Sequence, residues 1–398
     1  MIPYGKQWIS PQDIEAVVSV LKTDFLTQGP MVPRFEQAFA KKVNAEFAVS
    51  TNSATSALHV SCLALGVTAG DVVWTSPISF VASSNCALYC NATVDFVDID
   101  PSTYNMSVAA LERKLVEAEV EGTLPKVVIP VHLAGQSCDL KAIHALSLRF
   151  GFRIIEDASH ATGASYDGDP VGCCNYSDIA VFSFHPVKII TSGEGGMAVT
   201  NSHELMLRMS SLRSHGIIRD PSLMTIEPDG PWFYQQLELG FNYRMTDIHA
   251  ALGYSQLERL GDFVNRRQAI ANVYFEQLAI DGITLPVQNV GSYSSFHLFI
   301  LNFTNSSGPL ARNEVFNRLR KSGVNVNLHY IPIYRHPYYS AMGFDTSHFP
   351  EAEKYYQCAI SIPMYPSMTE SEQAFVIDVI KSDSAKVFQV SQGYQDLF

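Results

Sequence analysis

The sequence has few charged residues, no long apolar run and no paired arrangement of cysteines. Asp, Glu, Lys and Arg make up 17% of the 398 residues, and the formal net charge is −12. A nucleic-acid-binding surface needs clustered Lys and Arg, so this balance argues against one. No stretch approaches about 18 uninterrupted apolar residues, and no basic segment followed by an apolar one opens the chain. We therefore expect a cytoplasmic protein without a membrane segment.

The seven cysteines indicate neither a disulfide framework nor a metal site. Their number is odd, most lie inside apolar runs, and none has the paired spacing of metal ligands. We expect reduced thiols and no bound metal. Cys173 and Cys174 are adjacent, and neighbouring cysteines rarely bond to each other without strain, so we assign them no chemistry.

Apolar residues, by contrast, form 47% of the chain and allow a large core. At this length two packed lobes are more natural than one. Between residues 47 and 200, short apolar runs alternate with helical stretches. KVVIPVHL (126–133) and RIIED (153–157) are apolar on both alternating faces, as strands covered by helices on both sides are. The pattern predicts a doubly wound, mostly parallel α/β sheet.

The chain divides into three expected parts. Residues 1–30 form an N-terminal arm, with a short helix that begins after Ser10. Residues 31–250 form the large lobe, and residues 251–398 form a bridging helix and a small C-terminal α/β lobe. The small lobe is expected to contain strands and helices in the runs 296–303, 311–322, 324–330, 359–363 and 369–381.

Lys188 and Asp157 are the most informative polar residues. Lys188 lies in a loop that follows a predicted strand (179–184), and Asp157 ends another strand. Ligands of such sheets collect beyond the carboxyl ends of the strands. Pyridoxal phosphate (PLP) needs a lysine for a Schiff base and a carboxylate that keeps its pyridine nitrogen protonated, and this pair supplies both. Taken singly, Lys188 could be a solvated loop lysine and Asp157 a helix cap.

A phosphate site is the third element of the pattern. In TNSATSALH (51–59), small hydroxyl residues open an apolar helix directly after a short strand, and helix N-termini bind phosphate. A plain N-cap is the alternative for this stretch alone. Ser183 could add a hydroxyl group to the same phosphate. Phe80 follows the next strand and could stack on the pyridine ring, although alone it would be assigned to the core.

Together these segments resemble the sugar-nucleotide aminotransferases of the DegT type. The resemblance covers almost the whole chain and is carried by IPYGKQWIS, NSATSALH, SPISFVAS, VDFVDIDPSTYNM, PVHLAGQ, IIEDASHATGA, FSFHPVKIITSGEGG and LGFNYRMTDIHAALGYSQL. It implies the PLP-dependent fold of type I, that of aspartate aminotransferase, and a homodimer with shared active sites.

The resemblance also implies a role for individual residues. Lys188 would be the Schiff-base lysine, Asp157 the partner of the pyridine nitrogen and Phe80 the stacking aromatic residue, while His160 would lie beside the cofactor. The phosphate would be held by Ala54, Thr55, Ser183 and, from the other subunit, Asn242 or a neighbour. His329 and Tyr330 could line the substrate mouth, but a packed histidine at a strand end explains the pair equally well.

Transamination is the expected reaction, because a smaller branch of the family that dehydrates sugars has histidine in place of Lys188. NLHYIPIY (327–334) and SIPMYPSM (361–368) are most similar to the branch that serves pseudaminic acid synthesis. That branch implies L-glutamate as donor, 2-oxoglutarate as by-product, and a UDP-linked 4-keto sugar that becomes UDP-4-amino-4,6-dideoxy-N-acetyl-β-L-altrosamine. Amination of another nucleotide-linked keto sugar (GDP or dTDP, at C4 or C3) and a non-catalytic PLP-binding regulator are the alternatives. A nicotinamide-dependent enzyme is disfavoured by the lack of a GxGxxG motif after an early strand.

Overall fold

A seven-stranded sheet forms the centre of the computed structural model, which describes residues 1–304 and 310–395. Its strands lie in the order β1 (Phe47–Thr51), β9 (Gly196–Thr200), β8 (Ile179–Ser183), β5 (Arg153–Asp157), β4 (Val127–Ile129), β2 (Val72–Thr75) and β3 (Thr93–Phe96). The pairs β1–β9 and β8–β9 are antiparallel and the other neighbours are parallel. Only β9 therefore runs against the rest, and the predicted mostly parallel sheet is confirmed.

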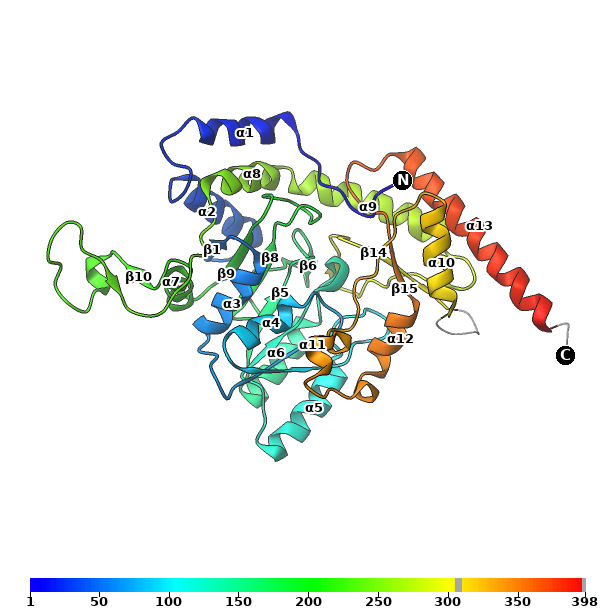
Figure 1. Ribbon diagram of the computed structural model, residues 1–398, viewed down its shortest axis with the longest axis horizontal. Helices are drawn as coiled ribbons and strands as arrows, with labels where there is room; N and C mark the ends of the chain where they lie inside the picture. The colour runs from blue at the N-terminus through cyan, green and yellow to red at the C-terminus, as the bar shows by residue number, and fades with distance from the viewer. Residues whose placement is uncertain (305–309, 396–398) are drawn as a thin grey trace.

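Helices cover both faces of this sheet, which explains why its strands are apolar on both sides. One face packs against α3 (Ala54–Ala64), α4 (Ala82–Tyr89) and α7 (His203–Leu212). The other packs against α5 (Val108–Glu121), α6 (Leu140–Phe150), α2 (Met31–Val43) and α8 (Asp247–Glu258). Side chains of β5 alternate between the two: Ile155 belongs to the first core and Ile154 to the second. Figure 1 shows these layers.

A second, smaller sheet lies in the C-terminal part of the chain. It is antiparallel, with the order β12 (Ile283–Thr284), β14 (Phe299–Phe303) and β15 (Ala359–Ile362). Its core is shared with α9 (Leu260–Gln277), α10 (Leu310–Lys321) and α13 (Glu370–Gln395), and α12 (Pro350–Cys358) leads into β15. The lobe limits at residues 30 and 250 stay a prediction, because α8 and α9 follow one another with only Arg259 between them.

One predicted strand of the small lobe is wrong. Residues 324–330 form no ladder and make only two isolated bridges, Val324 with Ile2 and Asn327 with Ser361. The N-terminal segment and β15 each take one pairing from this run, and the Tyr355 hydroxyl donates to the carbonyl of His329. The backbone groups of the run are thus divided among several partners, so no continuous ladder with one strand can form.

The N-terminal helix α1 (Pro11–Leu21) begins as its sequence predicts. The hydroxyl of Ser10 accepts the N–H of Asp13 at 3.2 Å, and the Asp13 carboxylate accepts the N–H of Ser10 at 2.8 Å. This reciprocal pair satisfies donors that a helix start leaves open. Asp13 also accepts from Ser255 and Gln256, which fixes α1 on α8.

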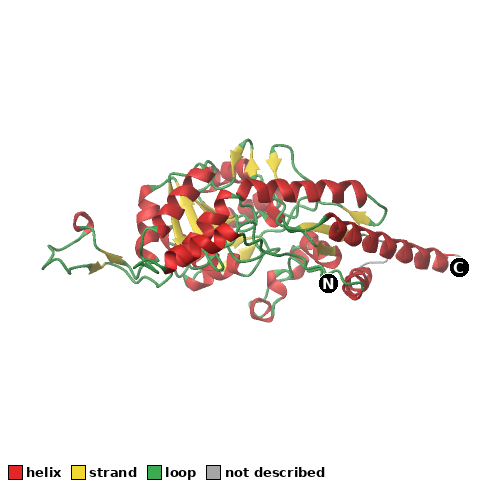
Figure 2. Cartoon of the chain, turned by 90° about the horizontal axis from the view of Figure 1, so that it is seen from above, coloured by secondary structure: helices red, strands yellow, loops and turns green. Residues whose placement is uncertain are grey.

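Several short elements complete the described chain. The hairpin β10 (Ile217–Ile218) and β11 (Gln235–Gln236) projects from the body beside α7, while α13 lies at the opposite end of the molecule (Figures 1 and 2). The hairpin exposes large apolar side chains, among them Ile226, Trp232 and Tyr234. The remaining elements are β6 (Ser165–Tyr166), β7 (Asp169–Pro170), β13 (Ser292–Tyr293), α11 (Pro337–Ser340) and short 3-10 turns at Leu133–Gly135, Pro221–Leu223, Ile333–Arg335 and Thr346–His348.

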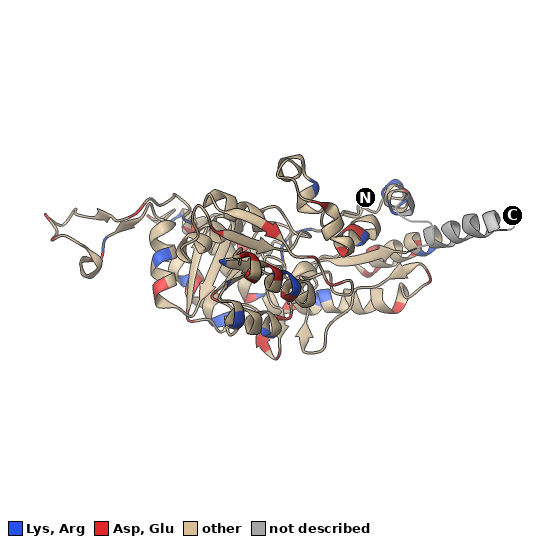
Figure 3. Ribbon diagram, turned by 90° about the horizontal axis from the view of Figure 1, so that it is seen from below, with Lys and Arg blue, Asp and Glu red and all other residues tan. Residues whose placement is uncertain are grey.

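Charged residues of both signs and free cysteines are spread over the structure. Lys and Arg alternate with Asp and Glu over the described elements (Figure 3). All seven cysteines are free; Cys174 is buried and Cys173 is partly exposed. No helix in residues 1–304 and 310–395 is long and apolar enough to cross a membrane.

Candidate active site

A cavity of about 1200 Å³ lies where the strands of the central sheet end. The segments that follow β1, β2, β4, β5 and β8 all contribute to its wall, as does the run 327–331 of the small lobe. Ligands of open α/β sheets bind at this edge because the loops after parallel strands converge there. The cavity therefore lies between the main sheet and the C-terminal part of the chain.

Most of the predicted site residues line this one cavity: Ala54, Thr55, Phe80, Asp157, His160, Ser183 and Lys188. The remaining predicted residue, Asn242, is exposed and does not line it. Asn242 pairs with Ser214, and its carbonyl accepts a long hydrogen bond of 3.5 Å from the amide of Asn52. Its predicted role from the other subunit stays a prediction.

Asp157 is held rigidly at the end of β5. Its side chain is 5% exposed, accepts the hydroxyl of Ser83 at 2.6 Å and accepts the N–H of Ser159 at 3.1 Å. Its backbone N–H donates to the carbonyl of Pro130 at 2.9 Å. A carboxylate with a fixed position and few water contacts is suited to hold a single cationic N–H group.

Lys188 lies in the turn after β8, where its N–H donates to the carbonyl of His185 at 2.9 Å. In the part of the chain that the structure describes, its ammonium group has no ion pair or hydrogen bond. Burial lowers the pKa of Lys188 to about 8, and the negative charge of Asp157 opposes this shift only partly. A substantial fraction of the amine is thus neutral near pH 8 and able to attack a carbonyl group.

The start of α3 leaves donors that face the cavity. Ser53 caps the helix by accepting the N–H of Ser56 at 3.1 Å, so the N–H groups of Ala54 and Thr55 have no partner within the helix. β9 passes close behind: a Cβ atom at Gly196 would lie 2.5 Å from the nitrogen of Ala54. Ser183 also lines this region, and its hydroxyl accepts a long hydrogen bond of 3.5 Å from the backbone N–H of His185. The arrangement suits a phosphate group.

An exposed aromatic ring forms another part of the wall. Phe80 is 58% exposed although it lies in the cavity, and its ring centroid is 6.3 Å from that of Tyr330. A large apolar side chain open to a cavity gains free energy when a flat ligand covers it. Phe80 is thus available for stacking and is not part of the core.

His160 is neutral and its proton is placed by its neighbours. Its Nδ1 accepts the N–H of Ala134 at 3.3 Å, so in a neutral ring the proton is on Nε2, which lies 3.0 Å from the Tyr330 hydroxyl oxygen. Burial and the nearby charge of Lys188 lower the pKa of His160 well below its ordinary value. His160 therefore donates to Tyr330, which leaves the Tyr330 proton for an acceptor in the cavity.

The site also contains residues that our sequence reasoning did not assign. Ser83 is one helical turn after Phe80, so the segment that pointed to Phe80 could have revealed it. Tyr4 and His297 also line the cavity, but they come from distant parts of the chain and no local pattern marks them. His329 and Tyr330 both line the cavity, as the first of their two predicted interpretations has it. The second also holds for His329, which is packed with Nδ1 at 2.8 Å from the Ser361 hydroxyl.

The available groups match the chemical needs of PLP. A helix start can hold its phosphate, an open aromatic ring can cover its pyridine face, a buried carboxylate can pair with its ring nitrogen, and an unpaired lysine can react with its aldehyde. Nothing in residues 1–304 and 310–395 groups three or more His, Cys, Asp or Glu side chains in a way that could hold a metal ion.

Comparison with known proteins identifies the family. The DegT/DnrJ/EryC1/StrS aminotransferase family matches residues 7–381. The chain belongs to this family. The spore coat polysaccharide biosynthesis protein SpsC of Bacillus subtilis is 34% identical over 385 residues, 96% of each chain. A UDP-4-amino-4,6-dideoxy-N-acetyl-β-L-altrosamine transaminase of Campylobacter jejuni is 35% identical over 398 residues, with 99% of this chain and 100% of the relative covered.

Solved structures agree with this assignment. A putative sugar aminotransferase from Streptococcus pneumoniae, solved in its pyridoxamine-phosphate form, superimposes with a TM-score of 0.88 at 28% identity, covering 97% of this chain and 100% of that one. The same protein has also been solved in a PLP form. The predicted type I fold, enzyme class and cofactor are thereby confirmed: the chain is a PLP-dependent sugar aminotransferase.

Proposed function

We propose that this enzyme moves the amino group of L-glutamate to C4 of a UDP-4-keto-6-deoxy-N-acetyl-hexosamine. The product would be UDP-4-amino-4,6-dideoxy-N-acetyl-β-L-altrosamine, an intermediate of pseudaminic acid synthesis, and the by-product 2-oxoglutarate. The Campylobacter relative, which is named for this amine and covered over its full length, supports the substrate. The resemblance of residues 327–334 and 361–368 to the same branch supports it independently.

The observation that carries the catalytic part is the state of Lys188. It is the only Lys or Arg among the described residues that line the cavity, it has no ion-pair partner there, and its pKa is about 8. PLP, when bound, supplies an electron sink that makes the hydrogen on the amine-bearing carbon acidic. The neutral amine of Lys188 would then move a proton between that substrate carbon and the C4′ carbon of the cofactor, in either direction of the transfer.

The other residues of the site would bind and orient the cofactor. Asp157 keeps a proton on the ring nitrogen, Phe80 fixes the plane of the ring, and the α3 start with Ser183 binds the phosphate. The Tyr330 hydroxyl accepts the Nε2–H of His160, so its own hydrogen is left to donate to an oxygen atom in the cavity.

We further propose that a second copy of the chain completes the site, with Asn242 reaching the phosphate across the boundary. The exposed apolar side chains of the hairpin β10–β11, including Trp232 and Tyr234, provide a surface for such contact. Mixed dimers of Lys188→Ala and Asn242→Ala chains test this arrangement. If Asn242 acts across the boundary, half of the sites in a mixed dimer are intact and activity returns; if it acts within its own chain, both sites stay impaired.

A second candidate is the amination of a different nucleotide-linked keto sugar. The Bacillus spore coat protein is as similar to this chain as the Campylobacter enzyme is, at 34% identity against 35%. Overall identity therefore does not separate the two substrates, and direct comparison of sugars is needed.

An absorption experiment tests the proposal. The purified protein should show a visible band from bound PLP that bleaches with L-glutamate and returns with one UDP-4-keto-6-deoxy-N-acetyl-hexosamine. Return with the L-configured sugar and not with its C5 epimer would support the altrosamine product. Return only with a GDP- or dTDP-linked keto sugar would support the second candidate. A band that glutamate leaves unchanged would rule out L-glutamate as the amino donor.

A further inference from the structure

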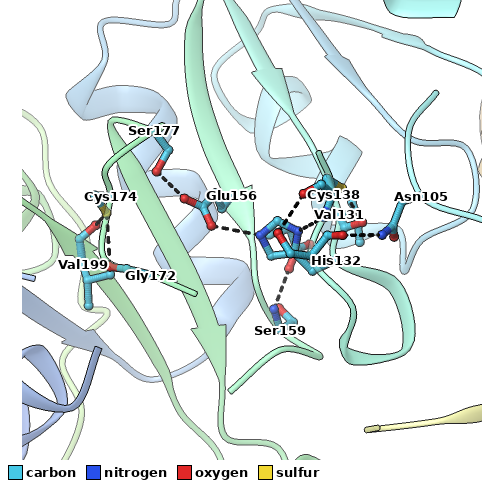
Figure 4. Close-up of polar contacts among 12 residues, drawn as sticks. Asn105, Val131, His132, Cys138, Glu156, Ser159, Gly172, Cys174, Ser177 and Val199 are labelled. Carbon is cyan, nitrogen blue, oxygen red and sulfur yellow. Dashed lines mark hydrogen bonds and ion pairs between the residues drawn. The ribbon is translucent and has the colours of Figure 1, made fainter. Parts of the chain in front are cut away.

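A buried imidazole–carboxylate pair lies on the side of the sheet that faces away from the cavity. Glu156 precedes Asp157 on β5, so its side chain points to the opposite face. It is 1% exposed, and His132, which follows β4, is fully buried beside it. Figure 4 shows the two side chains directed toward one another, with Ser177 on the far side of Glu156 and Cys138 beside His132.

The hydrogen bonds of the pair place one proton. The N–H of Cys138 donates to Nδ1 of His132 at 3.1 Å, so Nδ1 acts as an acceptor and the ring proton is on Nε2. Nε2 lies 2.9 Å from Oε2 of Glu156, and the Ser177 hydroxyl donates to Oε1 at 2.5 Å. Glu156 thus accepts hydrogen bonds from His132 and from Ser177. No Lys or Arg of the described residues forms an ion pair with it.

The same histidine also binds the residue on the cavity side through its backbone. The N–H of His132 donates to the carbonyl of Asp157 at 3.1 Å, and the N–H of Asp157 donates to the carbonyl of Pro130 at 2.9 Å. The segment after β4 therefore holds the end of β5 by two backbone bonds at Asp157 and one side-chain bond at Glu156. A movement of Glu156 would be transmitted to Asp157 through one peptide unit.

We propose that the His132–Glu156 pair is a positioning device for Asp157. It fixes the end of β5 and thereby the position of the Asp157 carboxylate that faces the cavity. A carboxylate held in place keeps its contact with a protonated ring nitrogen, whereas a displaced one loses it. The proposal rests on the use of PLP by this enzyme and not on the identity of the sugar, so it can fail while the sugar assignment stands.

Glu156→Gln is the decisive variant, because glutamine keeps the length of the side chain. Its oxygen can accept from His132 and its amide can donate to Ser177, so the shape is kept while the charge-assisted bond to His132 is replaced by a weaker neutral one. We expect the pH midpoint of the visible band of the bound cofactor to fall, and the dissociation constant of the cofactor to rise about tenfold. kcat should decrease while KM for L-glutamate stays near its normal value, because no substrate contact changes.

Asp178→Asn is the matched control, because Asp178 precedes β8 and contacts the other end of β5. Asp178 accepts the N–H of Ile154 at 2.8 Å and pairs with Arg153 at 2.7 Å. This control should lower thermal stability without moving the spectral midpoint or the cofactor affinity. Equal shifts of the spectral midpoint and the cofactor affinity in both variants would mean that the pair only stabilises the strand, and this would overturn the proposal. A Glu156→Gln enzyme with a normal midpoint and cofactor affinity would overturn it as well.

Ser177→Ala keeps the proposal testable if Glu156→Gln does not fold. It removes one of the two donors to Glu156 and leaves the charge and the His132 contact. We expect a loss of cofactor affinity of roughly two- to threefold, in line with one modest hydrogen bond. Unchanged affinity in a folded Ser177→Ala holoenzyme would contradict a positioning role for the pair.

Discussion

Asp157 and Glu156 are consecutive residues of one strand, but their surroundings differ. Glu156 is enclosed by two donors on a face where helices and strands fill the space. Asp157 faces a cavity in which Lys188 lacks an ion pair and Phe80 is largely exposed. Polar groups on the covered face thus have their partners within the chain, whereas those on the cavity face are left for a ligand.

This difference shows how a site can be recognised without a ligand. A buried nitrogen without a partner lies at the same edge: Nδ1 of His297 has no hydrogen bond among the described residues, and its ring is 4.4 Å from that of His160. Unsatisfied buried groups destabilise a fold unless they serve a bound molecule. The unpaired nitrogen of His297 and the unpaired amine of Lys188 thus lie on the cavity side, whereas the side-chain oxygens of Glu156 are both bonded.

Removal of the central amine should produce the largest effect. Lys188→Ala is expected to bind PLP only without a covalent bond and to lose turnover by at least about a thousandfold, because both nucleophile and proton carrier are gone. Steady-state rates and borohydride trapping of the cofactor check this. Near-normal turnover would refute the assignment of the cavity face as the catalytic one.

The pKa of Lys188 predicts a second large effect. A lysine with a pKa of about 8 is half neutral at pH 8, whereas a solvated one is neutral in well under roughly 1% of molecules. Reaction of Lys188 with a small aldehyde plus reductant should therefore rise up to about pH 8 and then level off. Peptide mass spectrometry of the PLP-free enzyme measures this profile, with the exposed Lys22 as internal control. A Lys188 profile that follows that of Lys22 would contradict a desolvated amine.

A carboxylate-to-amide change on each face sharpens the comparison. Asp157→Asn removes a charge-assisted bond to the ring nitrogen, worth about 1.5–3 kcal/mol, so kcat should fall roughly 10- to 100-fold. Glu156→Gln, one residue away, should have a smaller effect because it acts only through Asp157. Rates of the two variants measured side by side test this order. An Asp157→Asn enzyme less impaired than Glu156→Gln would reverse the roles of the faces.

The sequence predicted the parts of the site whose signals are local. A strand that ends in an acid, a loop lysine before glycines and a hydroxyl-rich helix start are each visible in a few residues, and the family resemblance assembled them. Other parts of the site depend on contacts between distant segments, which no local pattern encodes. They are the positions of Tyr4 and His297 and the hydrogen bond from His160 to Tyr330. Residues 324–330 misled us for the same reason, since their alternation resembles a strand while their backbone partners are divided.

The smallest effect should come from two matched phenylalanine substitutions, one on each face. Phe80 is 58% exposed in the cavity, whereas Phe152 is 3% exposed in the core behind the sheet. Phe80→Leu should weaken PLP binding roughly two- to tenfold through lost stacking, and should leave the melting temperature unchanged. Phe152→Leu should lower the melting temperature by about 1–3 °C through poorer packing and leave PLP affinity unchanged. Fluorescence titration of PLP and thermal denaturation of the PLP-free proteins measure both. If Phe80→Leu changed stability alone, its ring would belong to the core, and the boundary between the ligand face and the structural face would have to be moved.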